Sequence, residues 1–170
     1  MNSHGFEEMV SFHCESLYRF AFCLTHTEAD AGDLTQLAFS IYAKKGRQIS
    51  DCAKAKIRLF ITLHRCFLQS RRKKSRLPHS ELSESEAGLA PSPAKHSGEL
   101  DRAWILHSLS QVDEVCRAAV ALFYLEDYTC QEIAEILEVP VGIIKHRLYS
   151  GLSTLHAQLD LLLRSTVTPN

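Results

Sequence analysis

The stretch that decides the fold reads EIAEILEVPVGIIKHRL and runs from Glu132 to Leu148. Apolar residues recur at helical spacing on both sides of Val139-Pro140, and a proline cannot continue the first helix. The pattern predicts a short helix, a tight turn and a longer second helix, which is the outline of a helix-turn-helix. Such a module usually places its second helix in the major groove of DNA. Because Glu135 and Glu138 make the stretch itself acidic, attraction for phosphate must come from elsewhere in the chain.

Charge is segregated along the chain, although the formal net charge of its 170 residues is only -1. Residues 1–43 carry one basic and six acidic residues, residues 44–76 carry twelve and one, and residues 77–170 carry six and thirteen. The middle segment therefore has a net charge of +11. Because phosphate affinity depends on local positive charge, this segment is the predicted source of attraction for nucleic acid.

Helical periodicity covers most of the chain, and no strand pattern occurs. The first predicted helix carries an apolar stripe of Phe6, Met9, Val10, Phe12, Leu17, Phe20, Ala21 and Leu24, and a later one carries Ile57, Phe60, Ile61, His64, Phe67 and Leu68. After a Pro- and Ser-rich stretch, four short helices are expected, beginning with one from Leu100 to Ser108. The predicted fold is all-α, with two small helical domains at 1–76 and 99–165 joined by a flexible linker at 77–98.

The remaining features restrict the class of protein. No apolar run is long enough to span a membrane, and the N-terminus lacks the pattern of a signal peptide, so we expect a cytoplasmic protein. The six cysteines form no C-x-x-C pair and are expected to be reduced. We expect no metal site and no cofactor. No catalytic constellation is visible, so we do not expect an enzyme.

Two stretches resemble the extracytoplasmic-function (ECF) sigma factors of bacteria. LYRFAFCLTHTEADAGDLTQLAFSIYAKK, from Leu17 to Lys45, is similar to their region 2, and YLEDYTCQEIAEILEVPVGIIKHRLYSGLSTL, from Tyr124 to Leu155, is similar to their region 4. The resemblance implies a protein that binds core RNA polymerase and directs it to promoter DNA, without chemistry of its own. It also implies a probable anti-sigma factor as a partner, and no insertion into a membrane.

The resemblance assigns candidate contacts to both regions. A polymerase-binding face is expected on the acidic helix of region 2, formed by Asp30, Asp33, Gln36 and Leu37. Phosphate contacts are expected from the cationic segment at Arg65, Arg71, Arg72, Lys73 and Lys74. Promoter contacts of the helix-turn-helix are expected from the residues beside its apolar stripe, namely Ile143, Lys145, His146, Arg147 and Tyr149.

Several positions depart from the family pattern. Leu59 and Cys66 align with a tryptophan and an asparagine suited to holding an unpaired base, and Ser70 replaces an aspartate. Glu138 replaces the glycine of the helix-turn-helix turn. These departures leave two alternatives open: a sigma-like interaction module or mimic with little DNA binding of its own, and a stand-alone helix-turn-helix regulator.

Overall fold

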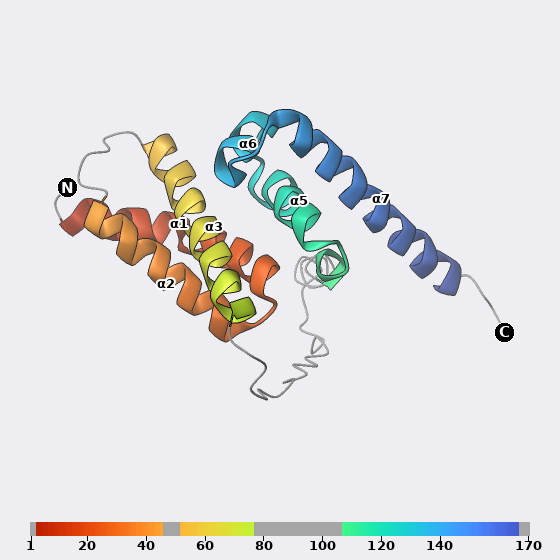
Figure 1. The fold of residues 1–170 in the computed structure, drawn as a ribbon, viewed down its shortest axis with the longest axis horizontal. Helices are drawn as coiled ribbons and strands as arrows, with labels where there is room; N and C mark the ends of the chain where they lie inside the picture. The colour runs from red at the N-terminus through yellow and green to blue at the C-terminus, as the bar shows by residue number, and fades with distance from the viewer. Residues whose placement is uncertain (1–2, 46–51, 77–106, 167–170) are drawn as a thin grey trace. The chain divides into compact units, whose positions relative to one another are not determined.

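The computed structural model describes residues 3–45, 52–76 and 107–166, and all of its elements in these ranges are helices. They are α1 (Ser3–Thr25), α2 (Glu28–Lys45), α3 (Cys52–Arg76), α5 (Glu114–Glu126), α6 (Cys130–Leu137) and α7 (Val141–Thr166), and residues 107–110 form a further helical turn (Figure 1). The described ranges contain no strand. The predicted all-α class is confirmed.

The chain divides into two compact units. The first contains Met1–Gly88 together with Glu135–Glu138, and the second contains Leu89–Ala134 and Val139–Asn170. Two helical bodies agree with the predicted organisation, but the predicted linker at 77–98 lies outside the described residues. The same holds for most of the helix predicted from Leu100 to Ser108, so the predicted domain boundaries stay predictions.

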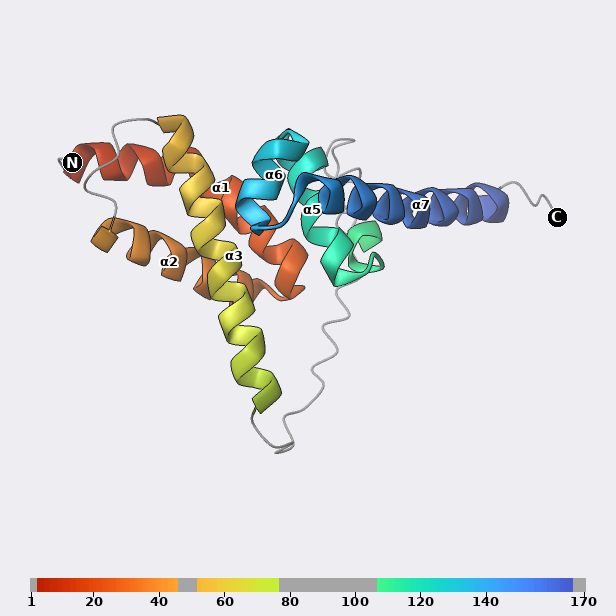
Figure 2. The ribbon, with the colours of Figure 1, turned by 45° about the horizontal axis from the view of Figure 1, so that its top comes forward.

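The first unit is built around α1, α2 and α3, which pack against one another (Figures 1 and 2). The Phe20 and Phe60 rings lie 5.4 Å apart between centroids and link α1 to α3 in the centre of this core. Helix α2 begins with a side-chain cap, in which the Asp30 N–H donates to Thr27 Oγ1 at 3.2 Å. This hydrogen bond fixes the connection between α1 and α2 at the start of α2.

The buried faces differ in part from the predicted apolar stripes. Phe12, which the periodicity places on the stripe of α1, is 79% exposed. On α3, Leu59 and Leu63 are fully buried although the predicted stripe omits them, whereas Leu68 is partly exposed. The reason is that α3 contacts two helices, α1 and α2, so its buried face is wider than a single stripe.

The start of the second unit is held by a buried arginine on α5. Arg117 Nε donates to the Leu109 carbonyl at 2.8 Å, and Nη2 donates to the carbonyls of Val112 and Ser110 at 2.7 and 3.1 Å. These carbonyls lie in the helical turn before α5 and in the connection to it, and the Leu109 carbonyl also accepts from the Val112 N–H at 3.1 Å. Arg117 thus compensates several acceptors at once and fixes the entry into α5.

Helices α5 and α7 approach closely at a glycine. A Cβ atom added to Gly151 on α7 would lie 2.5 Å from Val120 Cγ2 on α5. Val120 is fully buried, so it has no free space into which to retreat. Gly151 therefore sets the distance between the two helices, and with it the position of the start of α7.

The longest helix of the described ranges, α7, has 26 residues. None of those helices is both long and apolar enough to cross a lipid bilayer.

Candidate polymerase and nucleic-acid interfaces

The four residues predicted to bind polymerase lie together on the exposed side of α2. Asp30, Asp33, Gln36 and Leu37 are all exposed, and Leu37 shows 47% of its surface to solvent. The opposite side of α2 is buried through Leu34 and Ala38. The resulting face combines two carboxylates with an exposed leucine, which suits a partner surface that is basic and carries an apolar depression.

Helix α3 carries a line of cationic and polar side chains that the sequence reasoning recognised only in part. We define the α3 track as Lys54, Arg58, Thr62, Arg65, Gln69, Arg72 and Arg76. Arg58, Arg65 and Arg72 follow one another at seven-residue spacing and are exposed. A seven-residue step drifts by only about 20° around a helix, so the three guanidinium groups share one face. Arg58 was missed in the sequence, although this spacing is a readable signal.

The side chains of the run from Arg71 to Lys74 point in different directions around α3. Lys74 Nζ lies 3.6 Å from Asp30 Oδ2 on α2, and the Arg71 guanidinium carbon lies 5.9 Å from the centroid of the Phe67 ring. Both side chains are exposed, and both make these contacts within their own unit. Arg72 belongs to the α3 track, and Lys73 lies beside the track in the helical rotation.

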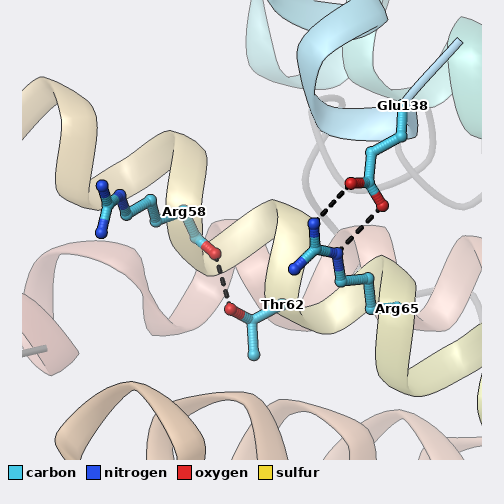
Figure 3. A network of polar contacts seen from close by, with 4 residues as sticks. All are labelled: Arg58, Thr62, Arg65 and Glu138. Atoms are coloured by element: carbon cyan, nitrogen blue, oxygen red, sulfur yellow. Dashed lines mark hydrogen bonds and ion pairs between the residues drawn. The ribbon is translucent and has the colours of Figure 1, made fainter. Parts of the chain in front are cut away.

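Arg65 holds a carboxylate with its guanidinium fork. Arg65 Nε donates to Glu138 Oε2 at 2.9 Å, and Nη2 donates to Oε1 (Figure 3). Glu138 is grouped with the same compact unit as α3. This hydrogen bonding raises the pKa of Arg65 and lowers the pKa of Glu138. Because both side chains are about half exposed, the pair contributes little to stability, about 1 kcal/mol at most.

The two residues aligned with the base-holding tryptophan and asparagine are core residues. Leu59 is fully buried and Cys66 is 6% exposed, both on the inward side of α3. Neither side chain can reach a nucleic acid while the bundle is folded. Ser70, in contrast, is exposed. Leu59 and Cys66 therefore belong to the core of the first unit and are not available to hold an unpaired base.

The expected promoter-contacting residues lie along the first turns of α7. Ile143, Lys145, His146 and Tyr149 are exposed, and Tyr149 shows 77% of its surface, whereas Arg147 is half-buried. Ile144 and Leu148 on the opposite side are buried. Sequence reasoning thus separated the outward positions of α7 from its core positions, with Arg147 at the border.

Local sequence fixes the two helices that surround the turn. Thr129 and Glu132 form a capping box at the start of α6, in which the Thr129 N–H donates to Glu132 Oε2 at 2.9 Å and the Glu132 N–H to Thr129 Oγ1 at 3.3 Å. Glu138 adopts a left-handed φ of 56° after α6, where glycine is the usual residue. The Ile143 N–H then donates to the Pro140 carbonyl at 2.9 Å in the first turn of α7.

Comparisons with known proteins agree with this arrangement. Residues 102–155 match the family described as Sigma-70, region 4. The ECF RNA polymerase sigma factor SigL of Mycobacterium tuberculosis is 26% identical over 150 residues, which cover 87% of this chain and 85% of SigL. The resemblance to the ECF sigma factors is confirmed.

Solved structures of sigma factors share the fold. The sigma factor RpoE of Bartonella quintana, solved with the anti-sigma factor NepR, superposes with a TM-score of 0.74 at 21% identity, covering 92% of this chain and 97% of that one. CnrH, solved with the cytosolic domain of CnrY, gives a TM-score of 0.65 at 20% identity, covering 94% and 90%. The helix-turn-helix of α6 and α7 lies largely within the residues that match sigma region 4, and the superpositions show that the chain shares the fold of these sigma factors.

Proposed function

We propose that this chain is a sigma factor of the ECF type, which binds core RNA polymerase and directs it to specific promoters. The observation that carries the proposal is the match of residues 102–155 to sigma region 4, together with the exposed residues of α7 inside that match. A region 4 helix with Lys145, His146 and Tyr149 outward has donors and apolar surface for base edges in a major groove.

The polymerase contact is assigned to the outward face of α2. Asp30, Asp33, Gln36 and Leu37 present carboxylates beside an apolar side chain, and such mixed surfaces give specificity and fast association with a basic partner. The cationic α3 supplies the attraction for phosphate that the acidic helix-turn-helix lacks, with Arg65, Arg72 and Lys73 toward the outside. In this arrangement the chain acts by binding polymerase and promoter DNA, and it does so in the cytoplasm, where both are found.

The direct test is run-off transcription with core polymerase on promoters of the host genome. A sigma factor gives discrete transcripts that depend on both core polymerase and this chain. If the chain binds core polymerase but starts no transcript at any host promoter, it is a sigma-like interaction module. If it binds duplex operators tightly without polymerase, it is a stand-alone regulator.

Asp33→Asn tests the polymerase contact while preserving the shape of the side chain. Loss of the charge should weaken binding to core polymerase by about tenfold, or ~1.4 kcal/mol, because an oriented carboxylate loses its attraction to the basic partner. Binding is measured by fluorescence titration of labelled chain with core polymerase.

Glu8→Gln is the matched control for that experiment, since Glu8 is an exposed acid on α1 away from the α2 face. The control should bind core polymerase like the native chain. Equal losses in the two variants would mean that overall negative charge, and not the α2 face, attracts polymerase.

An anti-sigma factor is a further proposed partner. The Bartonella quintana relative in fold was solved in complex with an anti-sigma factor. By analogy, a partner that covers the α2 face and the first turns of α7 would block both proposed contacts at once. Co-purification of the chain with proteins of its host, followed by competition with core polymerase, tests this proposal.

A further inference from the structure

An ion pair brings a cation of the chain itself to one of the proposed polymerase contacts. Lys74, in the last turn of α3, has its Nζ 3.6 Å from Oδ2 of Asp30, in the first turn of α2. Both side chains are exposed, at 68% for Lys74 and 49% for Asp30. The pair lies within the first unit, on two helices that pack against each other. The charge that Asp30 offers to a basic partner is thus already in contact with a charge of opposite sign.

The contact between Lys74 and Asp30 is weak enough to be exchanged. A separation of 3.6 Å allows attraction between the charges but is longer than an ordinary N–H···O hydrogen bond. Solvent screens a pair of exposed charges, and the long lysine side chain loses rotamer freedom while it is held. An arginine of a partner can donate two parallel hydrogen bonds to the same carboxylate, which is a stronger interaction. A guanidinium that arrives at Asp30 would therefore displace the Lys74 ammonium.

The surroundings of Asp30 show that the pair is not needed to hold either helix. The Asp30 N–H donates to Thr27 Oγ1 at 3.2 Å, so the start of α2 is fixed without help from Lys74. Helices α2 and α3 also pack against each other, and each has a buried apolar side, which includes Leu34 on α2 and Leu63 on α3. Lys74 can therefore leave Asp30 while the bundle stays folded.

We propose that Lys74 occupies, in the free chain, the place that a cationic side chain of core polymerase takes at Asp30. The inference rests on the proposed sigma function and adds an internal competitor to it, because polymerase binds at Asp30 only after Lys74 has left. Lys74 thereby lowers the affinity of the free chain for polymerase, and by linkage bound polymerase keeps Lys74 away from Asp30. Contacts that polymerase makes through Leu37 are not subject to this competition.

The test measures binding of the full, fluorescently labelled chain to core polymerase in the absence of DNA. Lys74→Gln removes the competing charge and keeps a long polar side chain at this position. An exposed ion pair is only weakly favoured over its open form, and the affinity of the native chain is reduced by the fraction of chains in which the pair is closed. The variant should therefore bind polymerase about two- to sixfold more tightly than the native chain.

Lys44→Gln is the matched control, because it removes one exposed lysine from α2 itself, about 21 Å from Asp30 at 1.5 Å per residue. This variant should bind polymerase like the native chain. A second comparison is made beside Asp30→Asn, where Lys74→Gln should change nothing, since no carboxylate is left to compete for. If Lys44→Gln tightens binding as much as Lys74→Gln, or if the gain persists beside Asp30→Asn, Lys74 acts only by general repulsion and the inference is overturned.

The same measurements separate this inference from the proposed function. If the native chain binds core polymerase and supports run-off transcription, but Lys74→Gln binds equally or more weakly, the inference alone fails. Weaker binding would make Lys74 a residue that contacts polymerase or orients Asp30. If the native chain does not bind core polymerase, the proposed function fails and the inference fails with it. Thermal melts of the variants, which should stay close to that of the native chain, show that changes in binding do not come from unfolding.

Discussion

At the scale of single residues, Glu138 combines an unfavourable backbone with a favourable side-chain contact. Its φ of 56° lies in the left-handed region, which costs a non-glycine residue about 1 kcal/mol or more. Its carboxylate binds Arg65, but exposed pairs of this kind contribute little. The free energy of unfolding of Glu138→Gly should therefore be about 1 kcal/mol higher than that of Glu138→Ala, as measured by chemical denaturation. Both variants lose the carboxylate, and only glycine relieves the backbone.

Acidification provides the control for that comparison. Arg65 lowers the pKa of Glu138, so the pair's contribution to stability is present above the ordinary carboxyl pKa and is lost as pH falls through the lowered pKa. Both variants lack this carboxylate, so the difference between them should be the same at neutral and acid pH in chemical denaturation. A difference that vanishes in acid would show that a titrating group, and not backbone strain, separates the variants.

Residue-scale prediction succeeded where a local rule applied. The positive φ at Glu138 was predictable because the family pattern has glycine there, and the outward position of Lys145 follows from helical spacing. The pair between Arg65 and Glu138 was not predictable, because its members are 73 residues apart and no local pattern links them. The inward direction of Leu59 and Cys66 was missed because the predicted apolar stripe of this helix omits both, while the tertiary contacts of α3 bury them.

At the scale of helices, the contact between α5 and α7 depends on the absence of a side chain. Gly151→Ala would place a methyl group 2.5 Å from Val120 Cγ2, and overpacking of this kind costs about 1–3 kcal/mol. Gly142→Ala is the matched control on the same helix, because a Cβ there meets nothing within 4 Å. The first substitution should lower the free energy of unfolding and the second should leave it unchanged or raise it slightly, as read from thermal melts.

Adding Val120→Ala to Gly151→Ala completes the test. The smaller side chain makes room for the new methyl group. The double variant should therefore lose less free energy of unfolding than the sum of the losses in the two single variants. If the losses in free energy of unfolding were strictly additive, Gly151 and Val120 would not be coupled, and α5 and α7 could move apart here to admit the methyl group. The sequence alone does not reveal this role of Gly151, because only the packing shows that it sets a distance between helices.

At the scale of the whole molecule, the sequence predicted two helical bodies and a cationic segment at 44–76 within the first, and two compact units are found. The segregation of charge was readable because acidic and basic residues fall in separate segments. Which exposed residues of the cationic segment contact their own unit and which lie on the α3 track was not readable, since Lys74 and Arg72 differ only in the direction that α3 gives them. Lys74 lies near Asp30, whereas Arg72 belongs to the α3 track.

This organisation predicts that substitutions in the two proposed DNA contacts, on α3 and on α7, change promoter binding in different ways. Arg72→Ala with Lys73→Ala should weaken binding of the polymerase complex to all promoters alike and reduce the log–log salt slope by about 2, since each removes a phosphate contact. His146→Ala or Lys145→Ala should cost about 1–3 kcal/mol at particular upstream base pairs and spare promoters that lack them. Promoter binding is measured for a set of promoters over a salt series, after polymerase binding has been shown to be unchanged. If replacing Lys145 and His146 leaves promoter choice as it was, the helix-turn-helix is an interaction fold and the sigma-like module becomes the better account.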